Sequence, residues 1–303
     1  MVCDPIEDDE FSPELSPAIL EASSIVKELS GESHTVLVRA SDGFIYVVNL
    51  MDARQGANIQ ANKALGNELA KYLGLSVPEW RPIEFSEACM ERFFLFHWTG
   101  SESWIDRPGS GLYFGSRAVV QDDPEAVYKE LPENWLNRIG NRDDFAGMLL
   151  LDLWANQVGN RKAMYVVASD GATVTAVFTG NGTMFGGFSG REEQRRGVAL
   201  YRDRRVYAGL DVNRAFSLWL QKAVAMDEAM FLRLARGVPR QWHDSGYLQG
   251  VASQLQIRKW RVAQLLEEEI SLIAKGTNEC GSLIGMPSKK SNGGSGEEGK
   301  MTA

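Results

Sequence analysis

The sequence predicts an α+β fold with two lobes, a small sheet-rich N-lobe and a larger helical C-lobe. Strand-like runs around a tight turn occupy residues 34–50, whereas helical patterns occupy residues 212–236 and 247–274. The chain has 303 residues, of which 44% are hydrophobic, and this is enough for a substantial core. We expect the N-lobe over residues 15–99 and the C-lobe over residues 100–275.

Both ends of the chain have the composition of disordered segments. Residues 1–14 are acidic, and residues 276–303 are rich in Gly, Ser and charge, so neither buries enough apolar surface to offset the entropy of ordering. The first ten residues lack the features of a signal peptide, and no apolar run is long enough for a bilayer. We therefore expect a cytoplasmic protein with no membrane contact. The net charge of −8 argues against a nucleic-acid partner.

The N-lobe is predicted to contain a hairpin, a helix and a further strand. HTVLVRA and FIYVVNL, within residues 34–50, are β-branched and aromatic and flank a Ser41-Asp42-Gly43 turn. Residues 59–73 carry leucines at helical spacing, and Gly74 follows where a helix should end. Residues 90–98 (MERFFLFHW) predict a buried strand.

The C-lobe is predicted to begin with a buried helix over residues 143–156, which are apolar nearly all round. A second hairpin follows over residues 163–178, and a glycine-rich loop over residues 179–187. The long helical patterns come after this loop. A sheet-rich lobe followed by a helical lobe that starts with a loop, a hairpin and a loop is the layout of protein-kinase-like folds.

The chain also resembles the HipA-like kinase family over roughly residues 18–270. The motifs that carry the resemblance occur in the family's order: Gly31-Glu-Ser-His34, DGFIYVVNL, Leu65-Gly-Asn67-Glu68, Leu73-Gly-Leu-Ser-Val-Pro78, Tyr113-Phe-Gly-Ser-Arg117, Asp152-Leu-Trp154, Arg161-Lys-Ala163 and Val238-Pro-Arg-Gln-Trp242. The resemblance implies a two-lobed protein that binds ATP and magnesium between its lobes and transfers the γ-phosphoryl group to a hydroxyl. Such a protein needs a strand lysine, a helix glutamate that orients the lysine, an aspartate that accepts the hydroxyl proton, and a metal-binding aspartate.

This sequence departs from the family at three charged positions. Aligned on the motifs, Asn49 replaces the strand lysine, Gly159 the proton-accepting aspartate and Gly180 the metal-binding aspartate. Asparagine has no charge to offset a phosphate, and glycine can neither accept a proton nor ligate magnesium. The resemblance thus implies a pseudokinase that acts by binding a nucleotide or a protein partner. ATP is the candidate cofactor, and magnesium is expected to bind weakly or not at all.

The candidate residues of the nucleotide cleft are Gly31, Ser33, Asn49, Glu68, Asn156, Asn160 and Asn181. Glu68 keeps the family's helix glutamate, and Asn181 keeps the amide of the metal loop. Two alternatives stay open: a weak or rearranged kinase that uses Asp143, Asp144, Asp152 or Asn181, and a scaffold whose cleft binds no nucleotide. The few cysteines and histidines are too scattered to chelate a metal or to form a disulfide framework.

Overall fold

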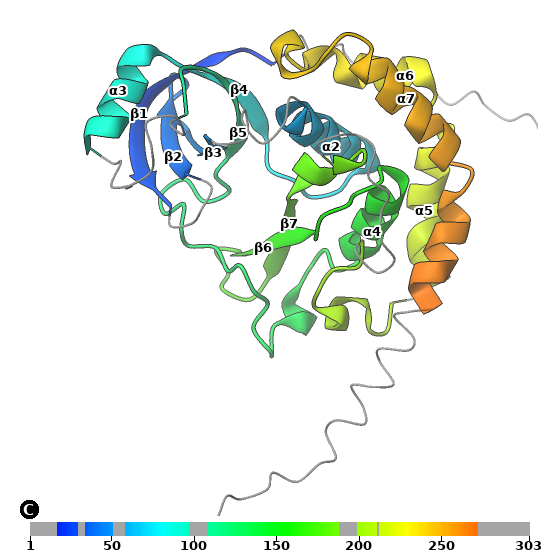
Figure 1. Cartoon of the computed structure of the whole chain (residues 1–303). Helices are drawn as coiled ribbons and strands as arrows, with labels where there is room; N and C mark the ends of the chain where they lie inside the picture. Colours follow the sequence, from blue (N-terminus) through cyan, green and yellow to red (C-terminus); the bar gives the residue numbers. More distant parts are fainter. Residues whose placement is uncertain are drawn as a thin grey trace, which may run out of the picture.

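The structure is a computed structural model that describes residues 17–29, 34–50, 58–96, 108–187, 199–210 and 212–271. Its N-terminal part is a five-stranded barrel, and the rest of the described chain is mostly helical (Figure 1). This arrangement confirms the predicted α+β class. The ends predicted to be disordered, 1–14 and 276–303, lie outside the described residues.

The barrel has the strand order β1-β2-β3-β5-β4. Its strands are β1 (Leu20–Glu28), β2 (Thr35–Ala40), β3 (Ile45–Asn49), β4 (Trp80–Phe85) and β5 (Gly111–Arg117). The predicted first hairpin is confirmed by the antiparallel pairing of β2 with β3. In its turn, Gly43 lies at a φ of 85° and donates to the Ala40 carbonyl at 2.9 Å. Parallel pairing of Leu20 with Ile83 closes the barrel between β1 and β4.

The last strand of the barrel lies beyond residue 99, where the N-lobe was expected to end. β5 pairs antiparallel with both β3 and β4 and therefore sits between them. The sheet is completed only by residues 111–117, which are part of the segment assigned to the C-lobe.

The strand predicted at residues 90–98 is wrong, because residues 90–96 belong to helix α3 (Glu87–Phe96); residues 97 and 98 lie outside the described residues. Ser86 begins the helix, and its Oγ accepts a hydrogen bond from the Cys89 amide at 3.2 Å. Met90 and Phe93, one helical turn apart, are buried in the core of the barrel. An apolar run of this length fits either a strand or a helix. The serine cap and the burial of residues at helical spacing both favour the helix.

Two predicted elements form the centre of the larger core. Helix α2 (Ile59–Leu73) ends at Gly74, which has a φ of 83°, as its pattern predicts. Helix α4 (Asp144–Trp154) is buried nearly all round, and the buried apolar residues of both helices belong to one cluster. The second predicted hairpin is confirmed as β6 (Lys162–Val167) and β7 (Val174–Thr179).

The C-terminal helical patterns are confirmed, but each of the two predicted stretches forms more than one helix. Helices α5 (Val212–Ala225), α6 (Glu228–Leu234) and α7 (Tyr247–Arg258) lie on the side of the molecule away from the barrel (Figure 1). The pattern over 247–274 is interrupted at 259–261, after which the chain is helical again over 262–271. Among the described residues, no helix is both long and apolar enough to cross a membrane.

Candidate functional site

Two loops lie where the family resemblance places the catalytic and the metal-binding segments. The first connects α4 to β6, and the second follows β7 and begins with the short helix η3 (Asn181–Thr183). Backbone hydrogen bonds join them: the Val158 amide donates to the Thr183 carbonyl at 3.0 Å, and the Phe185 amide donates to the Ala155 carbonyl at 2.7 Å. The two loops therefore form one hydrogen-bonded unit.

Arg161 is the centre of this unit. Its guanidinium forms a two-pronged ion pair with Asp152, in which Nε lies 3.0 Å from Oδ2 and Nη2 contacts Oδ1. Its Nη1 donates to the Thr179 carbonyl at 2.8 Å and to Asn181 Oδ1 at 2.5 Å. The side chains of Arg161 and Asp152 are 1% and 0% exposed, so this charge pair holds both loops from inside the protein.

The environment of Asp152 bears on the alternative of a rearranged kinase. Burial raises the pKa of this carboxyl, and Arg161 opposes the increase through its charge and hydrogen bonds. Both carboxylate oxygens bond the Arg161 guanidinium. Asp152 thus orders the loops, as its position on a buried helix suggests, and is not presented to a substrate.

Amide side chains tie helix α2 to the same loops. Asn62 is fully buried, and its Nδ2 donates to the carbonyls of Gly182 and Met184 at 3.2 and 3.1 Å. Its Oδ1 accepts a hydrogen bond from the Tyr247 hydroxyl. One turn and a half further along α2, Asn67 Oδ1 accepts from Asn181 Nδ2 at 3.3 Å. Neutral hydrogen bonds therefore connect α2 to the second loop.

Glycine allows α2 to approach η3 closely. A Cβ added at Gly66 would lie 2.6 Å from Asn181 Cβ and 2.6 Å from Met184 Sδ. A Cβ added at Gly182 would lie 2.9 Å from Ile59 Cγ1. Side chains of the loop therefore pack directly on the backbone of α2 at Gly66, and side chains of α2 pack on the backbone of the loop at Gly182.

The positions of Gly159 and Gly180 in the two loops are also adapted to glycine. A Cβ added at Gly159 would lie 2.4 Å from Thr183 Oγ1, so any side chain there requires Thr183 to move. Gly180 has a φ of 91°, in the left-handed region that L-residues rarely adopt. Its carbonyl accepts a hydrogen bond from Gln157 Nε2 at 3.0 Å. The surroundings of Gly159 and the backbone conformation of Gly180 therefore disfavour a larger residue at either position.

The other predicted residues are distributed over several places. Glu68 accepts a hydrogen bond from Trp80 Nε1 at 2.6 Å and pairs with Lys71 on its own helix. Asn156 is buried with a φ of 52°, and Asn160 is exposed. Asn49 ends β3 with a half-buried side chain. Gly31 and Ser33 lie outside the described residues. The structure brings Asn156, Gly159, Gly180 and Asn181 together in the joined loops.

Sequence reasoning missed the residues that connect the barrel to the helical part. Gln60 on α2 accepts from the Phe114 amide at 2.7 Å and donates to the Leu112 carbonyl at 3.4 Å. Trp242 Nε1 donates to the same carbonyl at 3.0 Å, and its ring packs against Trp80. The signal in the sequence was the presence of polar residues, Gln60 and Asn62, on the buried face of α2. Buried polar side chains are usually hydrogen-bonded, so these two residues indicated specific contacts.

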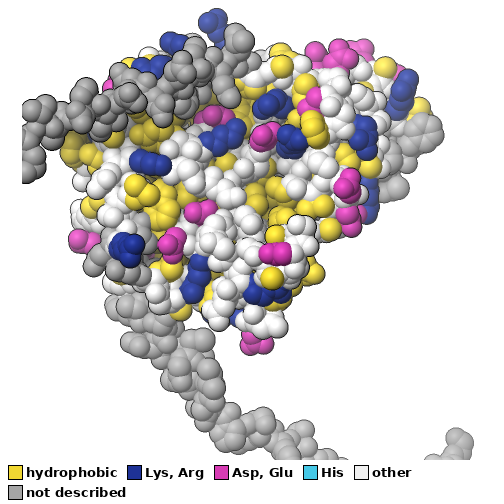
Figure 2. Space-filling view, turned by 180° about the vertical axis from the view of Figure 1, so that it is seen from behind, with side chains coloured by type: hydrophobic (Ala, Val, Ile, Leu, Met, Phe, Trp, Pro, Cys, Tyr) yellow, Lys and Arg dark blue, Asp and Glu magenta, His cyan; other side chains and the backbone are white. Residues whose placement is uncertain are grey.

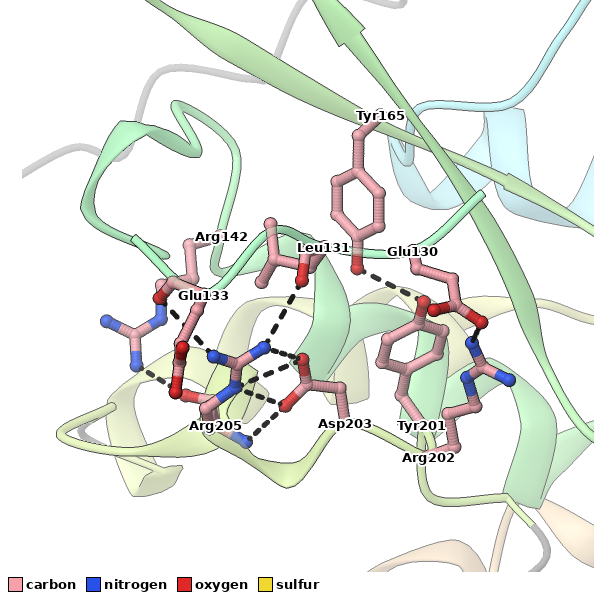
Figure 3. Close-up of polar contacts among 9 residues, drawn as sticks. All are labelled: Glu130, Leu131, Glu133, Arg142, Tyr165, Tyr201, Arg202, Asp203 and Arg205. Atoms are coloured by element: carbon pink, nitrogen blue, oxygen red, sulfur yellow. Dashed lines mark hydrogen bonds and ion pairs between the residues drawn. The ribbon is translucent and has the colours of Figure 1, made fainter. Parts of the chain in front are cut away.

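A second polar network fixes the chain after residue 198. Arg205 pairs with Asp203 at 2.6 Å, and Arg142 donates to the Arg205 carbonyl at 3.0 Å (Figure 3). Arg142 also donates to the Val206 carbonyl at 2.9 Å. The Tyr165 hydroxyl on β6 donates to the Tyr201 hydroxyl at 3.1 Å (Figure 3). Arg142 and Arg205 therefore serve the fold by fixing the backbone of this segment.

Other surfaces of the described chain offer no competing site of known chemistry. A cavity of about 310 Å³ lies between β1 and α3, lined by Ser23, Ser86, Cys89 and Arg92 among others, and includes none of the predicted residues. Figure 2 shows basic, acidic and hydrophobic side chains interspersed over one face. Within the described residues, no group of three or more His, Cys, Asp or Glu side chains could hold a metal ion.

Comparisons with known proteins give a limited result. No family model matches the chain, and no curated protein matches it by sequence. Among solved structures, the chain is similar to the crystal structure of the Golgi casein kinase with Mn/ADP bound, at 9% identity and a TM-score of 0.48. The alignment covers 85% of this chain and 73% of that chain. A likeness with a TM-score below 0.5 carries no conclusion about family or activity.

Proposed function

We propose that this chain is a HipA-like pseudokinase, which acts by binding a nucleotide or a protein partner without efficient phosphoryl transfer. The observation that carries the proposal is the geometry of the joined loops. Both positions assigned to essential aspartates are glycines, in backbone surroundings that would crowd or strain an aspartate. The retained motifs around them support a scaffold that has kept its shape while its charges were lost.

Proton transfer is the first function that the loops lack. A general base must lie within hydrogen-bond reach of the hydroxyl and contributes roughly 10²–10⁴ in rate. Gly159 offers no side chain, and the neighbouring Asn156 and Asn160 carry amides, which are not bases near neutral pH. Asp152 is fully buried and bonded to Arg161 through both oxygens.

Metal binding is the second function that the loops lack. Mg²⁺ prefers hard, charged oxygen ligands, and bound metal contributes several kcal/mol of transition-state stabilisation. The position assigned to the metal ligand is Gly180, and the adjacent Asn181 already bonds Arg161 and Asn67. The positive charge of Arg161 beside Asn181 also disfavours a cation there. The effects of losing the general base and the metal ligand on the rate are not additive, but each loss lowers the rate of phosphoryl transfer.

The test is phosphoryl transfer by the full chain with γ-labelled ATP, followed on the chain itself and on a general protein substrate. We expect no magnesium-dependent label above that of a mock purification. The variant Gly159→Asp alone and combined with Thr183→Ala should also be inactive, since the metal position and the strand lysine remain absent. Transfer by the unmodified chain that depends on magnesium and follows the protein through purification would disprove the proposal and favour the rearranged kinase.

Binding is tested separately by thermal unfolding with ATP, with and without Mg²⁺. A ligand at about one hundred times its dissociation constant stabilises the folded state by roughly 2.7 kcal/mol, which raises the unfolding midpoint by several degrees in a chain of this size. We expect a shift with ATP that does not require magnesium. The absence of a shift would favour the scaffold that binds no nucleotide.

A further inference from the structure

We propose that the cavity between β1 and α3 binds a small organic anion, with its acid group on Arg92 and its apolar part against Ile25 and Phe93. The cavity has a volume of about 310 Å³. β1 and α3 lie side by side at the barrel, away from α4 and from the hairpin of β6 and β7 (Figure 1). The inference therefore adds a second site to the proposed function and does not depend on it.

Residues 22–25 of β1 form one wall of the cavity. In a regular strand, successive side chains point to opposite faces, yet these consecutive residues all line the cavity. The reason is that the register with β2 shifts by one residue between Ala22 and Ser24, which is a β-bulge at Ser23. Such bulges re-aim side chains and are frequent next to functional sites. Ser23 and Ser24 are both exposed, so this wall offers two hydroxyl groups to a ligand.

One face of α3 and its capping serine form the opposite wall. Ser86, Cys89 and Phe93 follow one another at helical spacing and line the cavity. Ala88 and Arg92, one turn apart, line it beside them. Phe93 is buried in the core of the barrel, whereas Arg92 is exposed. The cavity is therefore apolar toward the protein interior and polar toward the solvent, which suits a ligand with an apolar body and one polar end.

Arg92 gives the cavity a positive charge. Among the described residues that line the cavity, no other side chain is basic and none is acidic, since Glu87 and Glu91 of the same helix are not part of the lining. Within the described part of the chain, the Arg92 side chain forms no hydrogen bond or ion pair. A guanidinium presents paired N–H donors that match the oxygens of a carboxylate or a phosphate. The cavity therefore favours an anion.

Cys89 does not oppose an anion in this cavity. Burial raises the pKa of its thiol above the ordinary value of 9.0, and the charge of Arg92 offsets the increase only in part. The thiol is therefore protonated and uncharged near neutral pH. It contributes a weak donor and a polarisable wall beside the Arg92 guanidinium.

The size of the cavity restricts the ligand to a small molecule. Ligand pockets have volumes of roughly 300–1,000 Å³, and this cavity lies at the lower end of that range. It suits a single ring or a short chain that carries one acid group. A carboxylate and a phosphate monoester share the chemistry that Arg92 recognises, and the experiment distinguishes between them.

Cys89 provides a built-in reporter of occupancy, because it lines the cavity. The full chain is alkylated with iodoacetamide alone and with benzoate, phenyl phosphate or benzyl alcohol, which is of similar size but uncharged. Peptide mass spectrometry gives the rate at Cys89, and Cys3 and Cys280 in the same digest report any general effect on the reagent. With an anion at about ten times its dissociation constant, measured by calorimetry, the rate at Cys89 should fall about tenfold. Benzyl alcohol at the same concentration should change it by no more than about twofold.

The matched variants are Arg92→Met and, as a control, Arg233→Met, which changes an exposed arginine of α6. Losing a charged hydrogen bond should weaken binding of both anions by about tenfold or more, whereas the control should change it by no more than about twofold. Because Arg92 also affects the Cys89 thiol, the readout for each variant is the ratio of rates with and without the anion. Ala88→Phe, at an exposed position of the lining, should fill the cavity and abolish the heat of binding.

The unfolding midpoints of the variants without ligand show whether each is folded, and Arg92→Gln replaces the methionine variant if that variant is not. Tighter binding of benzoate would identify a carboxylate site, and tighter binding of phenyl phosphate a phosphate site. Either result supports the inference when it depends on Arg92. The inference is overturned if neither anion binds or protects Cys89, if benzyl alcohol protects as well as benzoate, or if Arg92→Met binds both anions as tightly as the unmodified chain.

Discussion

Replacing Arg161 by methionine should strongly destabilise the fold, because Asp152 would remain buried with an unpaired charge. The two side chains are 1% and 0% exposed, so water cannot replace the lost guanidinium. Breaking a buried ion pair from one side costs about 3–5 kcal/mol. The Thr179 carbonyl and Asn181 Oδ1 lose a donor in the same change. For a chain of this size the unfolding midpoint should fall by on the order of 10 °C.

The effect should depend on pH in a defined direction. Burial raises the pKa of Asp152 above its ordinary value of 3.8, and removing Arg161 takes away the influence that lowers it. A carboxyl with a raised folded-state pKa destabilises the fold fully above that pKa, and the penalty disappears as the pH falls toward the unfolded value. The difference in unfolding free energy between the unmodified chain and Arg161→Met should therefore shrink from about pH 7 to about pH 5.

Urea unfolding at the two pH values measures both effects. The control is the double variant Asp152→Leu with Arg161→Met, which removes both charges and should recover much of the lost stability. A loss below about 1 kcal/mol for the single variant, or a loss that is the same at both pH values, would refute the reasoning from a buried charge pair.

Two further changes test close packing and helix capping. Gly66→Ala should cost about 1–3 kcal/mol of unfolding free energy because its Cβ would collide with Asn181. The control is Gly250→Ala, in open space on α7, which should be neutral or stabilising by about 1 kcal/mol. Equal effects of the two changes would argue against the close approach of α2 and the loop. Asp227→Ala removes the cap that accepts the Met230 amide at 2.7 Å and should cost about 1 kcal/mol in urea unfolding, and an unchanged midpoint would contradict that role.

The elements with strong local signals were predictable from the sequence. Both hairpins have tight turns between β-branched runs, and α2 has leucines at helical spacing before Gly74. Residues 90–98 were predicted wrongly because a short apolar run fits either a strand or a helix. The serine at position 86 and the acidic Glu87 were the local evidence for the helix start. The position of β5 between β3 and β4 depends on pairing between distant segments, which local patterns do not specify.

The candidate site was predictable only in part. The glycines at positions 159 and 180 follow from aligning motifs along the chain. The crowding of Gly159 by Thr183 does not, because it depends on how two loops meet. Arg161 entered the sequence reasoning as a marker of register, whereas its contacts reach α4, β7 and η3. A residue whose partners lie on three elements has a role that no single stretch of sequence can reveal.

The place of helix α2 has a consequence for how the chain folds. α2 connects β3 to β4 along the chain, but its apolar face belongs to the core it shares with α4. β5, which separates β3 from β4 in the sheet, is contributed by a later segment. A fragment that ends at residue 99 would therefore lack the strand between β3 and β4 and would expose the apolar face of α2. We therefore expect that the barrel does not fold on its own, and that calorimetry of the whole chain records one cooperative transition.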